Sequence, residues 1–292
     1  MMKKLVVRQV FIYNSIMVND IIHKKQNLKY LKWDLIRSSS GTAGSFLKSE
    51  DSVETPKTYY KLSNYDSVNG VFGHECVNEI IVDRLLTILE IDHLHYELIH
   101  ADINVSGKII ETYLCASKDF KKDKEKKVSL ETFYGIMKNE DESPIDFCKR
   151  MKWDKYIYQM LLVDYLILNR DRHGANIEVL RNSKGEFRLA PLFDHGLSLL
   201  FNCHSDKDVD KYDVMDDKAV QCFVGSHSAY DNLFLIPKNK YPKVNGLKES
   251  DKEILLEGLD DIISKKLRDK IWEMIYKRWK VYEDLRNQRW IR

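Results

Sequence analysis

The sequence predicts an α+β fold of two lobes, a sheet-rich N-terminal lobe and a mainly helical C-terminal lobe. Strand-like segments dominate the first part of the chain, and longer segments of helical periodicity dominate the second part. Residues 118–127 lie between them and are almost all lysine or acidic residues. Because such a charge run is typical of a solvated connection, we place the N-terminal lobe at residues 1–117 and the C-terminal lobe at residues 118–292.

The elements expected in the N-terminal lobe follow from the periodicity of apolar residues. Residues 4–13 and 58–62 have the composition of strands, and residues 95–103 and 108–116 are predicted to form a hairpin around a Ser-Gly turn. A helix is predicted over residues 77–91, because apolar side chains recur there at helical spacing, namely Val77, Ile81, Leu85 and Ile88.

In the C-terminal lobe, residues 154–168 are apolar at helical spacing and predict a largely buried helix. Residues 177–180 and 187–192 are predicted strands of a hairpin that turns near Gly185. Helices are also predicted over residues 251–266 and 267–290. The last helix has an apolar stripe that we expect to pack on the core, formed by Ile271, Ile275, Tyr282 and Leu285.

The most informative segment follows the predicted buried helix and has the form Asp-x-His-x-x-Asn, from Asp171 through His173 to Asn176. Asp194 follows in an Asp-x-Gly turn. A hairpin centred near Gly185 would place Asn176 opposite Asp194 at its open end. Carboxylate and amide oxygens are ligands for a hard divalent cation, and an aspartate followed five residues later by an asparagine is the spacing of a kinase catalytic loop. The segment therefore predicts a phosphotransferase.

Each of these features is weak when taken alone. An isolated Asp-x-Gly is usually only a turn, Asp171 alone could cap a turn, and a single histidine such as His173 is more often structural. The conjunction of the two motifs with a hairpin of fitting length favours phosphoryl transfer. His173 would then brace the loop or contact the transferred phosphate.

The N-terminal lobe offers groups that could hold a nucleotide. Residues 38–48 are rich in serine and glycine, so their hydroxyls and backbone N–H groups could wrap phosphates, although the Gly-Lys-Ser/Thr ending of a Walker loop is absent. Lys61 lies among apolar strand residues and needs an anionic partner if it is buried. The next helix offers three acids, of which one would pair with Lys61 and two are expected to be solvated: Glu75, Glu79 and Asp83.

Composition excludes several other classes of function. The 47 basic and 45 acidic residues give a net charge of +2, so no strong field would steer the chain to nucleic acid or to a membrane. No segment is apolar for long enough to span a bilayer. The 5 cysteines include no Cys-x-x-Cys pair, which predicts reduced thiols and a cytoplasmic protein. A zinc site is not expected, because the spacing of Cys203, His204, Cys222 and His227 matches no standard zinc motif.

The chain resembles the HipA-like serine/threonine kinases, bacterial relatives of the phosphatidylinositol-kinase-like fold that are often encoded in toxin–antitoxin modules. The resemblance is carried by residues 169–196, by Ser40-Gly41-Thr42 and by Asn78-Glu79. It implies a bilobal protein-kinase-like fold with a nucleotide-binding N-terminal lobe and a catalytic C-terminal lobe. Too few residues precede Ser38 for the separate N-terminal domain of full-length members, so the resemblance is to a compact form.

Roles for individual residues follow from the same resemblance, with ATP and Mg²⁺ as cofactors. Asp171 would face the acceptor hydroxyl, Asn176 and Asp194 would bind Mg²⁺, and Lys61, paired with Glu79, would bind the α- and β-phosphates. The backbone at Leu114 and Ala116 would meet the adenine. The triphosphate would be covered by a loop that includes Ser40, Gly41, Thr42, Gly44 and Ser45. Members of the family are silenced by a phosphate on a serine of this loop.

Three functions stay open on the sequence. The first is a kinase that phosphorylates serine or threonine in a protein substrate, with an antitoxin protein as a further partner and no direct binding to nucleic acid or membrane. The second is a small-molecule phosphotransferase, because aminoglycoside- and choline-kinase-like enzymes use a similar Asp-x-His-x-x-Asn loop. The third is a non-catalytic binding protein on a kinase scaffold, against which the intact set of polar residues argues. The serine- and glycine-rich loop and the Asp-His-Gly turn favour the first.

Overall fold

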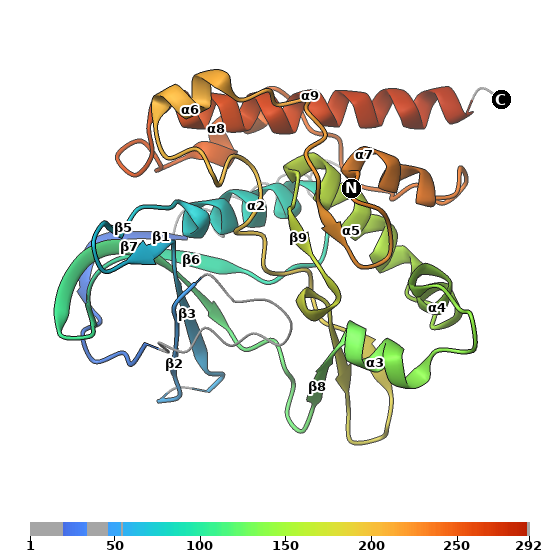
Figure 1. Ribbon diagram of the computed structural model, residues 1–292, viewed down its shortest axis with the longest axis horizontal. Helices are drawn as coiled ribbons and strands as arrows, with labels where there is room; N and C mark the ends of the chain where they lie inside the picture. Colours follow the sequence, from blue (N-terminus) through green and yellow to red (C-terminus); the bar gives the residue numbers. More distant parts are fainter. Residues whose placement is uncertain (1–19, 34–45, 54, 291–292) are drawn as a thin grey trace, which may run out of the picture.

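A computed structural model of the chain describes residues 20–33, 46–53 and 55–290. It confirms the predicted α+β fold, with a sheet-rich N-terminal part and a mainly helical C-terminal part (Figure 1). The predicted strand at residues 4–13 lies outside the described residues. In the part of the chain that the structure covers, no helix combines the length and the apolar character needed to cross a bilayer.

The N-terminal part is built on a five-stranded sheet in the order β1-β6-β7-β3-β2. Its longest strands form the predicted hairpin, and the turn between them places Gly107 at φ 87°, which a glycine adopts without strain. β1 runs parallel to β6, whereas the other neighbours are antiparallel. The strands are β1 (Ile21–Asn27), β2 (Lys48–Asp51), β3 (Thr58–Leu62), β6 (Tyr96–Val105) and β7 (Lys108–Lys118), and a small hairpin joins β4 (Tyr65–Asp66) to β5 (Gly70–Val71).

The two faces of this sheet bury different clusters. Side chains of alternate residues, among them Leu62, Ile99 and Leu114, form one apolar cluster on the face away from the helices. On the other face lies α2 (Glu75–Leu89), which begins two residues earlier than predicted (Figure 1). All but one of the residues of α2 are buried, because the helix lies between the sheet and the C-terminal part.

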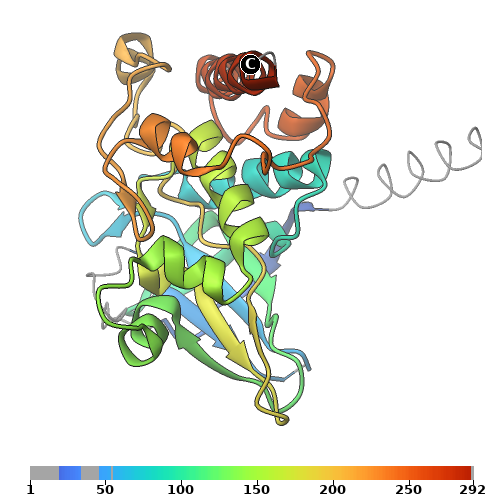
Figure 2. The same ribbon diagram turned by 90° about the vertical axis from the view of Figure 1, so that its right-hand side faces the viewer.

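The C-terminal part is organised around α5 (Asp154–Ile167), the predicted buried helix, whose residues from Leu161 to Ile167 are all buried. α9 (Lys265–Trp290) lies across the top of the molecule in Figure 1 and is seen nearly end-on in Figure 2. Its predicted apolar stripe packs on the core, since Ile271, Ile275 and Tyr282 are fully buried. Shorter helices complete the lobe: α3 (Leu130–Met137), α4 (Pro144–Arg150), α6 (Asp206–Lys211), α7 (Ala229–Asn232) and α8 (Asp251–Leu256).

Small sheets position the loops between these helices. β8 (Lys126–Ser129), β10 (Glu178–Arg181) and β11 (Phe187–Leu189) form a three-stranded sheet, of which β10 and β11 are the predicted hairpin. β9 (Asp171–Arg172) pairs in parallel with β12 (Gln221–Cys222). A one-turn 3-10 helix, η1 (Gly174–Asn176), follows β9, and η2 (Leu233–Leu235) follows α7.

Two element boundaries predicted from the sequence are wrong. The predicted helix over residues 251–266 ends at Leu256, because Gly258 adopts φ 70° and breaks the helix; the next helix begins only at Lys265. The predicted strand over residues 187–192 ends at Leu189. The apolar residues after it, including Leu192, are buried without belonging to the hairpin ladder.

Candidate active site

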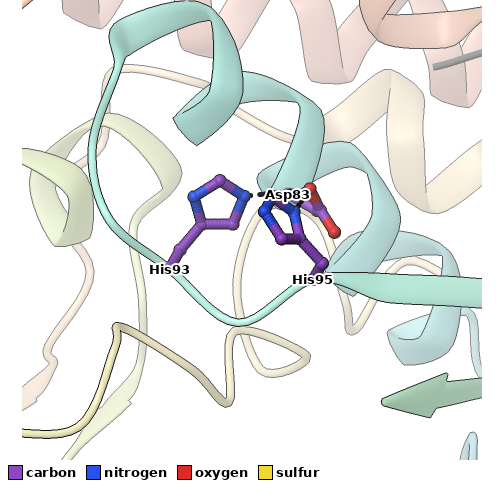
Figure 3. A group of neighbouring side chains, drawn as sticks. All are labelled: Asp83, His93 and His95. Atoms are coloured by element: carbon purple, nitrogen blue, oxygen red, sulfur yellow. Dashed lines mark hydrogen bonds and ion pairs between the residues drawn. The ribbon is translucent and has the colours of Figure 1, made fainter. Parts of the chain in front are cut away.

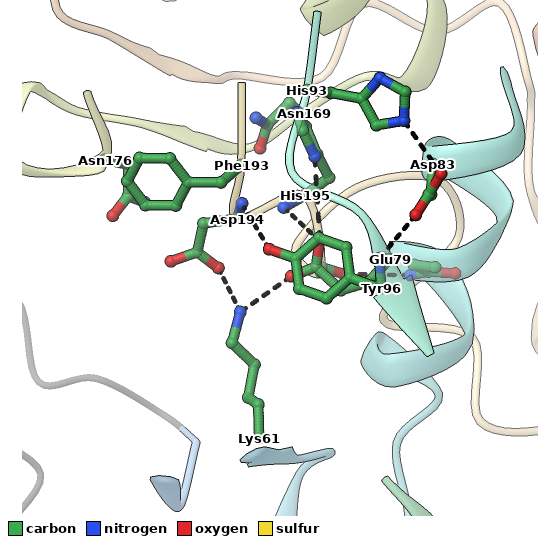
Figure 4. Close-up of polar contacts among 12 residues, drawn as sticks. Lys61, Glu79, Asp83, His93, Tyr96, Asn169, Asn176, Phe193, Asp194 and His195 are labelled. Atoms are coloured by element: carbon green, nitrogen blue, oxygen red, sulfur yellow. Dashed lines mark hydrogen bonds and ion pairs between the residues drawn. The ribbon is translucent and has the colours of Figure 1, made fainter. Parts of the chain in front are cut away.

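The ammonium group of Lys61 joins both lobes at the centre of the site. Lys61 lies on β3, and its Nζ donates to Glu79 Oε1 of α2 at 2.8 Å and to Asp194 Oδ1 at 2.5 Å (Figure 4). Its side chain is only 12% exposed, so the charge requires these partners. Burial alone would lower the pKa of Lys61, but the carboxylates of Asp194 and Glu79 outweigh it and hold that pKa well above its usual range.

The acids of α2 do not form the solvated stripe that we expected. Glu75, Glu79 and Asp83 are all buried, and each has its own polar partners. Glu75 accepts hydrogen bonds from the backbone and the side chain of Asn64, and Glu79 takes the ion pair with Lys61. Because α2 is covered by the sheet on one side and by the C-terminal lobe on the other, no face of it can solvate a row of acids.

Asp194 sits in a turn of constrained backbone geometry. Its φ is 59°, in the left-handed region that residues other than glycine seldom adopt. The backbone N–H of Asp194 donates to the hydroxyl of Tyr96, and that of His195 donates to Glu79 Oε2 at 2.9 Å. Burial holds the pKa of His195 well below its usual range, so its ring is neutral. These contacts aim the Asp194 carboxylate at Lys61.

Helix α2 and the chain after Asp194 approach each other closely at Gly196. A Cβ atom at this position would lie 3.2 Å from the Cβ of Glu75, tighter than ordinary packing. The Asn78 side chain then donates from Nδ2 to the carbonyl oxygens of Gly196 and Ser198, each at 3.0 Å. The glycine of the Asp-x-Gly motif therefore allows the helix that bears Glu79 to dock on the turn that bears Asp194.

The Asp-x-His-x-x-Asn segment folds into a compact loop around Asp171. The Asn176 side chain donates from Nδ2 to the backbone oxygen of Asp171 at 2.7 Å and to its Oδ2 at 3.3 Å. His173 Nδ1 accepts from the backbone N–H of Ala175, and its Nε2 lies 3.4 Å from Asp171 Oδ1. Asn176 and His173 thus both orient the carboxylate of Asp171.

The two aspartates of the site have opposite electrostatic environments. Burial raises the pKa of Asp171; the interaction with His173 opposes this shift, and the charge of Asp194 adds to it. Burial would also raise the pKa of Asp194, but the charges of Lys61 and Lys48 hold it below its usual range. Asp194 therefore stays ionised, whereas Asp171 is the better proton acceptor.

The oxygen atoms left at this end of the loop fit a hard divalent cation. Asn176 uses its amide nitrogen toward Asp171, which directs its side-chain oxygen elsewhere. Among the described residues, Oδ1 of Asp194 contacts Lys61, and no hydrogen bond occupies its Oδ2. One ionised carboxylate and one amide oxygen match the ligands that Mg²⁺ takes in proteins.

A buried arginine that the sequence analysis did not identify holds the loop and the Asp194 segment together. Arg172 is 1% exposed and pairs with Asp164 of α5 at 3.0 Å. Its Nη1 donates to the backbone oxygens of Asn176, at 3.2 Å, and of Phe193, at 2.9 Å. The sequence signal that could have revealed this pair is Asp164, an acid in the middle of an otherwise apolar helix.

The predicted register of the hairpin is wrong by two residues. Val179 pairs with Leu189, which would place residue 192, and not Asp194, opposite Asn176. The turn causes this difference, because the side chain of Asn182 accepts from the backbone of Lys184 and Glu186 and centres the turn before Gly185. Asn176 and Asp194 reach the same end of the hairpin through Arg172 and not through the ladder.

The remaining predicted nucleotide contacts stay predictions. Leu114 is fully buried in the apolar cluster of the sheet, so it could meet a ligand only through its backbone. Ala116 lines a cavity of about 410 Å³ that continues along residues 117–120 and 93–97. The predicted phosphate-covering residues all lie outside the described residues: Ser40, Gly41, Thr42, Gly44 and Ser45.

Comparison with known proteins supports the fold. No protein-family model matches the sequence, and no curated protein matches it either. The structure is similar to that of the proinflammatory kinase CtkA of Helicobacter pylori, with 15% identity and a TM-score of 0.56 over 87% of this chain and 93% of that chain. The chain therefore has a protein-kinase-like fold.

Two further solved structures are more distantly similar. HipA of Shewanella oneidensis MR-1, solved with HipB and operator DNA, is 13% identical, with a TM-score of 0.38 over 85% of this chain and 58% of that chain. A mutant of the PAN3 pseudokinase of Neurospora crassa is 12% identical, with a TM-score of 0.33 over 86% of this chain and 59% of that chain.

Proposed function

We propose that this chain is an ATP-dependent kinase of HipA-like type that phosphorylates serine or threonine residues of a protein. The observation that carries the proposal is the convergence of Lys61, Glu79 and Asp194 on one side with Asp171 and Asn176 on the other. Phosphoryl transfer depends mainly on positioning and on neutralising charge. This arrangement supplies a fixed cation, an oxygen site for Mg²⁺ and a carboxylate suited to accept a proton.

Each side chain has a distinct task in the proposed reaction. Lys61, held by Glu79, would bind the α- and β-phosphates of ATP, while Asp194 and Asn176 would hold the Mg²⁺ that offsets the phosphate charge. Asp171 would orient the acceptor hydroxyl and take its proton as the hydroxyl oxygen bonds to the γ-phosphorus. The bond from that phosphorus to the β–γ bridging oxygen breaks, and ADP leaves. His173 would keep Asp171 in position.

The test is transfer of labelled γ-phosphate from ATP, measured on a panel of proteins and on a panel of aminoglycosides and amino alcohols. We expect label on protein, and Lys61→Met to abolish it. Lys57→Met is the matched control, because Lys57 lies close by in the chain but pairs with Glu50 at the surface. Label on small molecules alone would establish the second function, and no ATP turnover on either panel would establish a non-catalytic kinase fold.

The proposal includes autophosphorylation between Ser38 and Ser45, a segment outside the described residues. A phosphoserine adds about −1.5 to −2 charge, which would repel the triphosphate of ATP and switch the enzyme off. Mass spectrometry after incubation with Mg²⁺–ATP is the measurement. Equal phosphate in this segment of the wild type and of the Asp171→Asn variant would contradict autophosphorylation.

An antitoxin partner is a further part of the proposal, and it rests on the sequence resemblance alone. Affinity purification of the tagged chain from cells that express it with its neighbouring genes would test this point. Recovery of no protein in stoichiometric amount would remove the antitoxin from the proposal without affecting the kinase assignment.

A further inference from the structure

A cluster of three metal-ligating side chains lies outside the candidate active site. Asp83 comes from α2, and His93 and His95 come from the segment between α2 and β6 (Figure 3). Asp83 Oδ1 is 2.9 Å from His93 Nε2 and 3.1 Å from His95 Nδ1. In the part of the chain that the structure describes, no other group of histidine, cysteine or acidic side chains converges in this way.

The contacts of His93 are those of a histidine that ligates a cation. Its Nδ1 lies 2.7 Å from the carbonyl oxygen of Ile91, which can only accept a hydrogen bond. Its Nε2 faces the carboxylate of Asp83, which as an anion also only accepts. A neutral imidazole has one N–H and cannot serve both. A second proton or a cation between Nε2 and the carboxylate would resolve this conflict, and the only other polar contact of Nε2 among the described residues is the Thr87 hydroxyl at 3.4 Å.

A cation explains the whole cluster better than a second proton does. Metal-binding histidines usually donate their other ring N–H to a carbonyl or a carboxylate, as Nδ1 of His93 is placed to do. His95 brings a second imidazole nitrogen to the same oxygen of Asp83, while Asp83 Oδ2 is held at 2.6 Å by the backbone N–H of Tyr96. Two ring nitrogens and one carboxylate oxygen therefore converge.

We propose that Asp83, His93 and His95 bind a divalent transition metal of the Zn²⁺ class. Two imidazole ligands suit zinc, cobalt or nickel, and not Mg²⁺ or Ca²⁺, which prefer oxygen. Tetrahedral coordination at roughly 2.0–2.1 Å would separate the ligand atoms by about 3.3 Å. The two distances from Asp83 Oδ1 to the ring nitrogens, 2.9 and 3.1 Å, are within a few tenths of an ångström of this separation, and all three ligand atoms lie within 4.8 Å of one another. His95 is 66% exposed, and both histidines line the cavity of about 410 Å³, from which water would supply a fourth ligand.

The position of the cluster gives the metal a bracing role for the active site. Asp83 is one helical turn from Glu79 on α2, and the segment that bears the histidines is joined to the chain before Asp194, since the N–H of Leu94 donates to the carbonyl of Leu192 at 2.8 Å. Tyr96 links the two sites directly, because its N–H holds Asp83 and its hydroxyl accepts from the N–H of Asp194 (Figure 4). A metal ion here would fix α2 against the Asp194 segment.

The experiment uses the full chain, freed of metal by a chelator and kept without nucleotide or Mg²⁺, with Co²⁺ and Zn²⁺ alone as probes. We expect one equivalent of Co²⁺ to give the visible absorption of a four- or five-coordinate site, Zn²⁺ to displace it, and Zn²⁺ to raise the Tm. His95→Ala, at an exposed position, should weaken Zn²⁺ binding at least ~10-fold. His100→Ala is the matched control, because His100 also contacts an acid, Glu111 at 2.9 Å, but belongs to no group of three ligands in the described part of the chain.

Two results would overturn the proposal. One is Co²⁺ and Zn²⁺ binding that is absent in the wild type or unchanged in both His95→Ala and Asp83→Asn. The other comes from ¹⁵N NMR of the His93 ring with excess Zn²⁺. Two ring N–H protons would show that a doubly protonated imidazolium, and not a metal, bridges to Asp83. A single N–H on Nδ1 with a shifted Nε2 resonance is the result expected for the bound metal.

Discussion

Asp171 and Asp194 show how one residue type takes two tasks within a single site. Burial raises the pKa of Asp171, whereas the lysine charges around Asp194 outweigh burial and hold its pKa low. Pairs of carboxylates whose environments push their pKa values apart are typical of acid–base assignments in active sites. The raised value suits a group that accepts a proton, and the depressed value suits a group that stays charged toward a cation.

The first prediction concerns Asp171→Asn. The amide cannot accept the proton of the acceptor hydroxyl, and the loss of a general base typically slows transfer about 10²–10⁴-fold. Affinity for Mg²⁺–ATP should stay unchanged, because in the proposed site Asp171 would face the acceptor and not the triphosphate. Turnover and calorimetry together measure the two effects, with the exposed Asp213→Asn as control. Wild-type turnover in Asp171→Asn would show that another group is the base.

Asp194→Ala should lose the affinity for Mg²⁺–ATP that Asp171→Asn keeps. Removing this carboxylate deletes the charged ligand of the proposed Mg²⁺ site and one of the two partners of Lys61. We expect calorimetry to show loss of Mg²⁺-dependent ATP binding, with a smaller loss in Asn176→Ala, because the oxygen ligand removed there is neutral. Unchanged affinity for Mg²⁺–ATP in Asp194→Ala would exclude Asp194 as a ligand.

Arg172→Lys tests whether the buried Arg172 holds the Asp171 loop and the Asp194 segment together. A lysine cannot reproduce the fork that contacts Asp164, the carbonyl of Asn176 and the carbonyl of Phe193. The lysine keeps a charge opposite Asp164 but leaves the two carbonyls without their donor, which costs about 1–3 kcal/mol for each unsatisfied group, so the midpoint of urea unfolding should fall. Arg150→Lys, at a partly exposed pair with Glu142, is the control and should move the midpoint much less. Equal losses in the two variants would contradict the assigned role.

Among the elements, α2 carries more of the site than its sequence indicated. Its apolar periodicity predicted the helix correctly, but the same pattern predicted solvated acids where the structure has Glu75, Glu79 and Asp83 buried. Periodicity reports which faces are apolar, and it cannot show that a second lobe covers the polar face as well. The helices α5 and α9 and the β6–β7 hairpin were predictable, because each buries one continuous apolar stripe or strand face.

Other features depend on contacts that a local pattern does not contain. The hairpin register was set by the side chain of Asn182 within the turn, and the end of α8 was set by a single glycine conformation at Gly258. The residues of the proposed catalytic loop could be found from spacing, since their proposed chemistry requires neighbours in sequence. The contact of Tyr96 with Asp194 could not, because the two residues are 98 positions apart in the sequence.

A further prediction concerns Asn78 of α2, whose side chain docks this helix on the segment after Asp194. Asn78→Ala leaves the buried carbonyl of Gly196 without its donor and leaves that of Ser198 with only the backbone N–H of Phe201, at a cost of roughly 1–3 kcal/mol in the free energy of unfolding. The exposed Asn69→Ala, which loses only contacts within its own turn, should change stability by about 0.5 kcal/mol or less. Urea unfolding measures both. Equal stability of the two variants would show that Asn78 does not fasten the helix.

For the whole molecule, the docking of the two lobes buries polar groups that must stay neutral. His74, at the start of α2, is 8% exposed and has no partner for Nε2 among the described residues. Burial, with a smaller contribution from the charge of His204, lowers the pKa of His74 from 6.5 to about 4. Burial acts in the same direction on His195, near the Asp194 turn. A fall in pH should therefore lower the free energy of unfolding before most carboxylates are protonated.

The sign of this effect follows from proton linkage. Between pH 6.5 and about 4 the unfolded chain binds a proton at His74 that the folded chain does not, so the free energy of unfolding falls as the pH falls through this window. At pH 5 the loss assigned to His74 is about 2 kcal/mol relative to pH 8. Glutamine does not titrate in this range, so the loss of stability between pH 8 and pH 5 should be smaller by that amount in His74→Gln than in the wild type. His23→Gln, at an exposed position, is the control for replacing a histidine. Urea unfolding at both pH values is the measurement, and identical losses in the wild type and in His74→Gln would contradict a buried neutral His74.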